Sequence, residues 1–323
     1  MRSKTIITAL AATAASLAVA GPAAAQTVLV EQARPFSVDA AKGVSVYSQY
    51  DDSIDAYRLV ARQDGQLKTL NVDPLPVPFD VDIGTNRAGA LVAVYSRSIG
   101  DENTDLFRYS FASDSETRLT SLSRADADER DPSVWNGDIA FVRSTADGKQ
   151  RLMVGRTGAN GAPRTLVKRQ GNGAIVNPAL SSLRVAYVTA GTRDEFEFQA
   201  VHTRTLRAGI DRTIHVARSG GANFAQVTGP SWSDTGKALY FARTNMGSGT
   251  GNRYHRYSPA TGQVTEARGR SDAISTAFIG GTEGLLVTTN PTVAQDECSY
   301  DDGAGKPTTC QLIATGPLTY SRP

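Results

Sequence analysis

The sequence is poor in the residues that most often perform catalysis or bind transition metals. Its 323 residues include three histidines, His202, His215 and His255, and two cysteines, Cys298 and Cys310. The histidines are scattered, and none has the spacing of a zinc-binding HExxH motif. The sequence also lacks the G-x-S-x-G motif of serine hydrolases. These absences argue against the common zinc and serine hydrolases, and they leave sites built from carboxylates to be considered.

An excess of charge of one sign is also missing. Lys and Arg total 34 and Asp and Glu total 32, which gives a formal net charge of +2. The two signs are interspersed, so the chain has no basic footprint for nucleic acid or for an anionic membrane surface. Beyond the first 25 residues, no segment is apolar enough to span a bilayer. We therefore expect no nucleic-acid partner and no membrane span.

Residues 1–25 have the pattern of a secretory signal peptide. Arg2 and Lys4 form a charged start, an apolar run follows, and Ala23-Ala24-Ala25 provides small residues at a cleavage site. We expect cleavage near Ala25-Gln26 and a mature protein, residues 26–323, that is secreted or periplasmic. In that oxidising location, Cys298 and Cys310 are expected to form one disulfide. The loop-entropy model values such a bridge at roughly 3 kcal/mol.

A hairpin motif recurs along the mature chain. Asp131–Arg143 reads DPSVWNGDIAFVR, and Gly229–Arg243 reads GPSWSDTGKALYFAR. Each copy has a Pro-Ser opening, a Trp, a turn containing Gly, and an alternating apolar strand that ends in Arg. The residues that carry this blade motif are Trp135, Gly137 and Phe141 in the first copy, and Trp232, Asp234, Gly236 and Phe241 in the second.

Weaker copies of the motif extend the series over the whole mature chain. The equivalent strand positions are Tyr47, Tyr95, Phe141, Tyr187, Phe241 and Leu286. Their spacing of roughly 45–55 residues is in the range of propeller blades or slightly longer. Further strands follow each position, which amounts to four strands per unit and six units. The sequence therefore predicts an all-β fold: one six-bladed β-propeller of four-stranded antiparallel blades over residues 26–323.

The two ends of a closed ring have to be joined, or the first and last sheets would keep open edges. An additional strand, Thr27–Val30, precedes the first full unit. We expect this strand to complete the last blade as its outer edge.

The repeat resembles a known family. The run Pro230–Phe241, followed by a strand and a closing Leu-Thr in related units, is similar to the WD40-like (PD40) repeat of the TolB β-propeller domain. This resemblance implies a propeller fold over nearly all of the mature chain. The repeats leave no room in this chain for a separate α/β domain ahead of the propeller. A TolB-like role in envelope import is therefore not implied.

The two tryptophans have two interpretations. Trp135 and Trp232 could be platforms on which a sugar or peptide stacks. Their equivalent place in the repeat instead predicts a structural role, in which each packs one blade against the next.

Acidic residues gather before the first strand of the third unit. Asp126, Asp128, Glu129 and Asp131 lie close together in the sequence, and clustered carboxylates suit hard cations such as Ca²⁺. None of the acidic loops matches the EF-hand pattern. The alternative is that they are solvated turn residues, because Asp is a preferred turn former.

Two functions from different classes are compatible with the sequence. The first is a non-catalytic binding module at the cell envelope or outside the cell, with a protein or cell-surface ligand as its partner. The second is a metal-dependent lactonase-like or esterase-like hydrolase, in which carboxylate and amide side chains hold a cation that activates water. That enzyme would need its ligands to converge on the propeller axis. Asp80, Asp82, Asp131 and Asn177 are the candidates near the starts of first strands.

Overall fold

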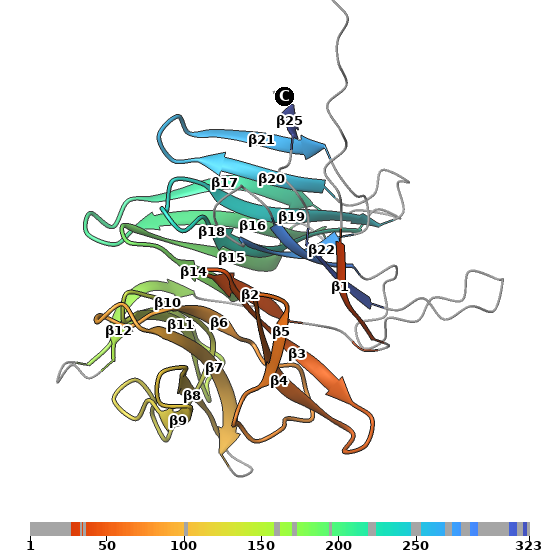
Figure 1. Ribbon diagram of the computed structural model, residues 1–323. Coiled ribbons are helices and arrows are strands. Elements are labelled where there is room, and N and C mark those ends of the chain that lie inside the picture. The colour runs from red at the N-terminus through yellow and green to blue at the C-terminus, as the bar shows by residue number, and fades with distance from the viewer. Residues whose placement is uncertain are drawn as a thin grey trace, which may run out of the picture.

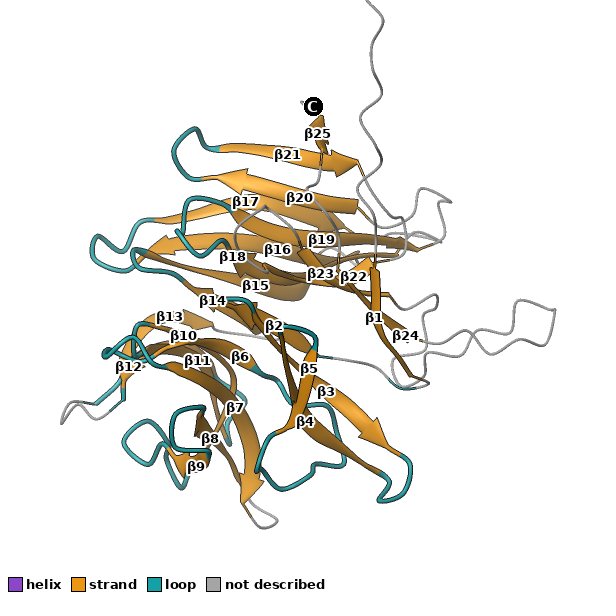
Figure 2. Cartoon of the chain, in the orientation of Figure 1, coloured by secondary structure: helices purple, strands orange, loops and turns teal. Residues whose placement is uncertain are grey.

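The computed structural model describes an all-β chain. The described residues are 27–32, 34, 37–99, 103–157, 162–169, 173–193, 196–218, 224–246, 253–268, 273–278, 285–289, 310–314 and 319–321. Strands and their connections make up this part of the chain, as Figure 2 shows, and it contains no helix capable of crossing a membrane. The predicted signal peptide, residues 1–25, lies outside the described residues.

The first three sheets each contain four antiparallel strands in chain order. The first sheet consists of β2 (Val38–Ala41), β3 (Val44–Asp51), β4 (Ala56–Gln63) and β5 (Gln66–Thr69). The second consists of β6 (Asp82–Thr85), β7 (Leu91–Ile99), β8 (Asn103–Ser110) and β9 (Ser115–Arg118). The third consists of β10 (Ala127–Trp135), β11 (Asp138–Thr145), β12 (Gln150–Arg156) and β13 (Arg164–Arg169).

The remaining sheets continue this order. The fourth consists of β14 (Ala174–Leu180), β15 (Arg184–Arg193), β16 (Phe196–Thr205) and β17 (Asp211–Arg218). The fifth begins with β18 (Phe224–Trp232), β19 (Leu239–Met246), β20 (Arg253–Ser258) and β21 (Gln263–Arg268). The last contains β22 (Ala273–Phe278), β23 (Leu285–Thr289), β24 (Cys310–Ala314) and β1 (Thr27–Gln32).

The sheets follow one another around a closed circuit. Their first strands contact one another in the order β2, β6, β10, β14, β18 and β22, and β22 in turn contacts β2. Sheets of antiparallel strands repeated around a common centre form a β-propeller. In Figure 1 the red strand β1 lies among the blue strands from the other end of the chain.

The structure contradicts the prediction of a six-bladed propeller of four-stranded blades. In the described part of the chain, five sheets are four-stranded blades, and the remaining sheet has five strands. The additional strand is β25 (Thr319–Ser321), which pairs antiparallel with β21. The sequence repeats ended before this segment, so they could not predict that the end of the chain covers an otherwise open sheet edge.

The prediction that an N-terminal strand closes the last sheet is confirmed. Strand β1 pairs antiparallel with β24, with Thr27 opposite Ala314 and Gln32 opposite Cys310. The first strand of the chain thus covers the outer edge of the last sheet. The pairing gives β24 a strand neighbour on both sides, so the backbone groups of β24 are not left unpaired.

The repeat positions found in the sequence all fall on the second strand of a sheet. Those strands are β3, β7, β11, β15, β19 and β23, which carry Tyr47, Tyr95, Phe141, Tyr187, Phe241 and Leu286. The five aromatic side chains are each at most 2% exposed. The sequence pattern therefore identified the second strand of every sheet correctly, and in the first five sheets the residue at this position is buried.

The turn within the repeat follows from its residues. Asn136 and Gly137 have φ angles of 48° and 78°, and they connect Trp135 directly to Asp138 across the β10–β11 hairpin. A two-residue turn with both φ angles positive is the type I′ turn, which favours Asn-Gly because other residues are strained there. The predicted hairpin is confirmed.

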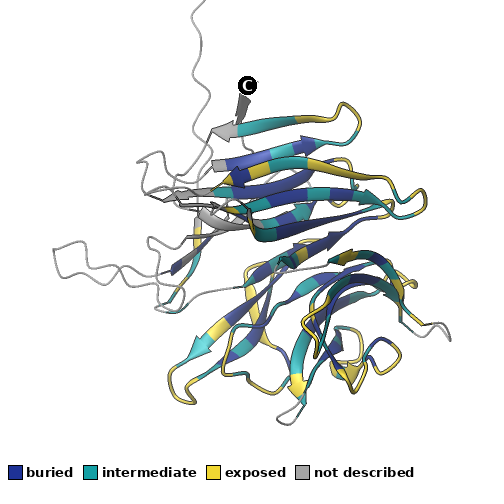
Figure 3. Cartoon of the chain, turned by 180° about the vertical axis from the view of Figure 1, so that it is seen from behind, coloured by how far each residue is buried: buried dark blue, intermediate teal, exposed yellow. Residues whose placement is uncertain are grey.

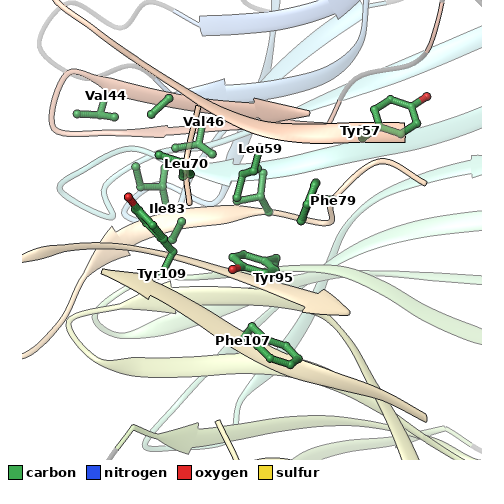
Figure 4. Close-up of a cluster of buried hydrophobic side chains, with 13 residues drawn as sticks. Val44, Val46, Tyr57, Leu59, Leu70, Phe79, Ile83, Tyr95, Phe107 and Tyr109 are labelled. Atoms are coloured by element: carbon green, nitrogen blue, oxygen red, sulfur yellow. The ribbon is translucent and has the colours of Figure 1, made fainter. Parts of the chain in front are cut away.

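Apolar side chains between neighbouring sheets form the core. Figure 4 shows one such cluster, in which Val46 and Leu59 of the first sheet meet Tyr95 and Phe107 of the second, with Phe79 beside them. Burying a large apolar side chain contributes roughly 1.5–3 kcal/mol. In Figure 3 the buried residues run along the strands, while exposed residues gather at the turns. Packing between sheets thus fixes the positions of the first strands at the centre.

The first strands of the second and third sheets approach each other closely at a glycine. A Cβ atom at Gly84 in β6 would lie 2.5 Å from the backbone oxygen of Val134 in β10. No side chain fits at that distance, so glycine is required there. The contact brings Asp82 of β6 beside β10, where the candidate site lies.

Candidate functional site

A cavity of about 550 Å³ lies among the first strands of five consecutive sheets. Strands β2, β6, β10, β14 and β18, or the residues just before and after them, line this central cavity. Because a propeller brings the first strand of each sheet to its centre, residues far apart in the sequence meet here. Cavities of this size commonly bind small ligands or part of a larger partner.

The lining of the central cavity is acidic. Its described residues include five carboxylates and one lysine, Lys42, and the five are Asp39, Asp80, Asp82, Asp131 and Asp234. Lys42 Nζ lies 3.3 Å from the backbone oxygen of Gly89, to which it donates a hydrogen bond. The lining therefore carries an excess of acidic groups, which favours cationic ligands.

Equivalent hydrogen bonds, each from a backbone N–H to a side-chain oxygen, link the first strands of successive sheets. The backbone N–H of Ile83 donates to Asp39 Oδ2 at 2.8 Å, and that of Val134 donates to Asp82 Oδ1 at 2.7 Å. At the equivalent place in the next sheet, the N–H of Leu180 donates to Ser133 Oγ at 2.8 Å. These side chains therefore have a structural role, since each joins one sheet to the next.

Asp80 and Asp131, which lie two residues before Asp82 and Ser133, make a second set of hydrogen bonds between sheets. Asp80 accepts hydrogen bonds from the backbone N–H groups of Ser96, at 2.6 Å, and of Asp131, at 2.8 Å. Asp131 in turn accepts one from the backbone of Asn177. Asp131 and Asn177 have φ angles of 50° and 49° and lie within β-bulges of their strands. The bulges break the regular register at the cavity wall.

Burial changes the acidity of these carboxyl groups. It raises the pKa of Asp39 to about 7 and that of Asp131 to about 6. Burial, with the neighbouring Asp39 carboxylate, raises the pKa of Asp82 well above its usual value. The pKa values of Asp80 and Asp234 are raised as well, mainly by burial. Near neutral pH the cavity therefore contains both carboxylic acids and carboxylates, and a bound cation would favour the ionised forms.

The four acidic residues predicted as a metal site have different surroundings in the structure. Asp126 is exposed and pairs with Arg124 through Oδ2 at 2.5 Å, and Asp128 lies 3.3 Å from Arg130 Nη2. Asp131 is the member of the four that lines the central cavity. In the described part of the chain, no three His, Cys, Asp or Glu side chains are grouped so that they could hold a metal ion.

Glu129, the fourth of these residues, is fully buried and belongs to an ion pair. Its Oε1 lies 2.6 Å from Nε of Arg143, and its Oε2 accepts a hydrogen bond from the backbone of Arg124. Arg143 also donates to the backbone oxygen of Leu122 at 2.6 Å. Arg143, which ends the repeat strand in the first copy, is thus the partner of a buried carboxylate.

The structural role predicted for the tryptophans is supported by their contacts. Trp232 is 6% exposed and donates from Nε1 to the backbone oxygen of Ala179 at 2.9 Å, which joins β18 to β14. Trp135 packs against the apolar cluster that includes Leu180. Each ring therefore contacts an adjacent sheet, although both tryptophans also border the central cavity.

The other residues of the blade motif divide between core and turn. Phe141 and Phe241 are completely buried, whereas Gly137 and Gly236 occupy turns with φ angles of 78° and 65°. Asp234, expected as a structural residue of the blade motif, also lines the cavity.

Sequence reasoning missed Asp39 as a site residue. It lies in the short strand β2 before Lys42, and no motif there resembles the later repeats. Its position at the centre follows from the register of β2 against β3, where Asp39 pairs with Val46. Asp82 pairs with Val94 at the equivalent place in the next sheet, and this correspondence between the two units is a signal that could have revealed Asp39.

The predicted disulfide involves one residue that the structure describes. Cys310 is buried, with 1% exposed, in strand β24, and Cys298 lies outside the described residues. The pairing therefore stays a prediction. A mass shift on alkylation without prior reduction would contradict it.

Comparisons with known proteins identify the class of fold. No family model and no curated protein matches the chain. Among solved structures, the chain is similar to TolB from Acinetobacter baumannii, with 13% identity, coverage of 72% of this chain and 54% of TolB, and a TM-score of 0.51. The fold is thus a TolB-like β-propeller.

Other similar structures are enzymes. An oligogalacturonate lyase from Vibrio parahaemolyticus has 11% identity, with 94% of this chain and 96% of the lyase covered and a TM-score of 0.52. The GH93 α-L-arabinofuranosidase of Fusarium graminearum also has 11% identity, with 87% and 92% covered and a TM-score of 0.52. The chain spans about half of the first two matched structures, 54% of TolB and 49% of a puromycin-hydrolysing peptidase from Mycobacterium tuberculosis. At these identities the likeness concerns the fold alone.

Proposed function

We propose that this protein is a non-catalytic binding module that works outside the cytoplasm, and that its central cavity receives a cationic group of its partner. The observation that carries the proposal is the concentration of Asp39, Asp80, Asp82, Asp131 and Asp234 around one cavity, with Lys42 as the one described cation in the lining. Ammonium and guanidinium groups are the cations that a protein or cell-surface partner offers to such a site. Export by the predicted signal peptide would bring the protein to that partner.

The chemistry of the cavity predicts how binding depends on pH. A cation requires ionised carboxylates, and the pKa values of Asp131 and Asp39 are about 6 and about 7. Affinity for a cation should therefore increase from about pH 5 to about pH 8, with proton release on binding. Spermidine, titrated by calorimetry in two buffers of different ionisation enthalpy, is a suitable small probe.

Affinity capture tests whether the protein binds a partner through the central cavity. The immobilised protein would be exposed to envelope extract and culture supernatant, beside a variant with Asp80→Asn and Asp131→Asn. Asn at residue 131 keeps an oxygen for the backbone hydrogen bond from Asn177, whereas Asn at residue 80 keeps one of the two acceptor oxygens of Asp80. A circular dichroism spectrum like that of the wild type would show that the fold of the double variant persists. Asp52→Asn, on an exposed turn outside the cavity, is the matched control. Capture of one partner by the wild type and the control but not by the double variant supports the proposal, and equal capture by all three contradicts it.

A metal-dependent lactonase-like or esterase-like hydrolase is the second candidate. One observation favours it: Asp80, Asp82, Asp131 and Asn177 line a single cavity, as that function requires. However, both oxygens of Asp80 already accept hydrogen bonds, and the described side chains form no metal-binding group. No reaction step follows from this geometry. Lactone and ester substrates offered with and without Ca²⁺ would test it, and hydrolysis lost on Asp82→Asn would favour this candidate over the binding module.

A further inference from the structure

A second cavity, of about 880 Å³, lies beside the later strands of the third and fourth sheets. Its lining comes from β13, β15, β16 and β17, and we call it the lateral groove. It shares no described residue with the lining of the central cavity. The lateral groove is therefore a separate candidate site, and neither proposed function uses it.

Stacked rings form part of the wall of the lateral groove. The rings of Tyr187 and His202 are nearly parallel, at 12°, with centroids 5.0 Å apart. Thr189 Oγ1 lies 2.9 Å from His202 Nε2, and Asp211 Oδ1 lies 3.6 Å from His202 Nδ1. The imidazole is thus held on both nitrogens, and the wall is pre-formed rather than dependent on a ligand for its shape.

The charge of the lateral groove is opposite to that of the central cavity. Lys168, Arg169 and Arg218 line it, with Asp211 as the one acidic residue of the described lining. Asp211 is already occupied, because it accepts a hydrogen bond from Tyr187 Oη at 2.5 Å and lies 3.5 Å from Arg204 Nη1. The three cations are therefore not neutralised from within the groove.

Arg169 is held in place by its surroundings. Its Nη2 donates to the backbone oxygen of Ala190 at 2.9 Å, and its guanidinium carbon lies 6.0 Å from the centre of the Phe198 ring. A Cβ atom at Gly191 would lie 2.8 Å from Arg169 Nη2, so the glycine leaves space for the guanidinium. One hydrogen bond leaves other N–H groups of the guanidinium to bind an oxyanion. Lys168 and Arg218 are exposed, and no described carboxylate pairs with either.

We propose that the lateral groove binds a small anionic ligand that carries several oxyanion groups, such as carboxylates. Three cations around one cavity match separate oxyanions of one ligand, and the fixed Arg169 offers the planar donors that carboxylates prefer. The volume is sufficient for a ligand of ordinary metabolite size. Binding involves only charge pairing and hydrogen bonding, without a covalent step.

Calorimetric titration with citrate at low ionic strength tests the proposal. Lys168→Gln and Arg218→Gln should each weaken citrate binding roughly fivefold to tenfold, because each removes a charged hydrogen-bond donor. Arg207→Gln removes the same charge from an exposed turn outside the groove and should leave the affinity unchanged. Citrate should also shift the NMR signals of the His202 ring.

A second probe defines the ligand chemistry. Inorganic sulfate that competes with citrate indicates a general oxyanion site, whereas citrate binding without competition indicates a requirement for several carboxylates. Failure of both probes to bind at about 10 mM would overturn the proposal, as would equal weakening by Arg207→Gln. Asp39→Asn should not alter citrate binding, so this test is independent of the function proposed for the central cavity.

Discussion

Replacing Asp39 by Asn measures directly what it costs to keep a carboxyl group in the wall of the central cavity. In the folded protein burial raises the pKa of Asp39 from 3.8 to about 7, so the fold favours the protonated acid. The folded state then binds more protons than the unfolded state between these values. The stability of the wild type therefore falls as the pH rises through this window. Asn resembles the protonated acid in shape, and it can still accept the hydrogen bond from Ile83.

The size of the effect follows from the same values. The pKa of Asp39 differs between the unfolded state, 3.8, and the folded state, about 7. Once the carboxyl group is fully ionised, this difference lowers the free energy of unfolding by about 4 kcal/mol. Part of this cost arises jointly with other carboxylates of the cavity, notably Asp82, which remains in the variant. We therefore expect Asp39→Asn to be more stable than the wild type by about 1–3 kcal/mol near pH 8, with a difference close to zero near pH 4.

Urea unfolding followed by circular dichroism at several pH values is the appropriate assay. An unchanged slope of free energy against urea would show that the variant alters stability rather than compactness. Asp52→Asn, on an exposed turn, is the control and should have no effect at either pH. The reasoning would be refuted if Asp39→Asn were less stable than the wild type near pH 8, or if its advantage were the same at every pH.

Three further predictions concern the framework around the cavity. Trp232→Ala should cost about 3–5 kcal/mol, since it removes a buried ring and the hydrogen bond to Ala179, and Trp232→Phe should cost less; thermal unfolding distinguishes them. Deleting Thr27–Gln32 exposes the edge of β24 and should lower the melting temperature and promote aggregation, measured by light scattering; an unchanged melting temperature would argue against closure by β1. Arg143→Met should destabilise the protein by about 3–5 kcal/mol because it leaves the buried Glu129 carboxylate without its charged partner. Adding Glu129→Gln should recover part of this loss, measured by urea unfolding. A double variant no more stable than Arg143→Met would contradict a stabilising role of the ion pair.

The two cavities differ in charge and in the strands that line them. The central one is acidic and is built from first strands, while the lateral groove is basic and is built mainly from third and fourth strands. In a propeller the first strands are held by neighbours on both sides, whereas later strands diverge and leave space between sheets. The described part of the chain therefore presents two surfaces of opposite charge.

The sequence by itself determined the local structure of this protein. Alternating apolar residues and Asn-Gly or similar turns decide where strands start and end, and these depend only on neighbouring residues. The recurrence of Tyr47, Tyr95 and Phe141 identified the buried second strands, and the extra strand near residue 27 predicted the closure. Such features are readable because each repeat unit contains its own signal.

The tertiary structure alone decided the candidate site. Asp80 and Asp131 are 51 residues apart in the chain, yet the backbone of one donates to the carboxylate of the other. The neighbouring acidic residues Glu129 and Asp131 separate, one into a buried ion pair and one into the cavity. The pairing of β25 with β21 likewise arises from a meeting of distant segments. Contacts between sheets depend on how the whole ring closes, and strand periodicity contains no information about which residues that closure brings together.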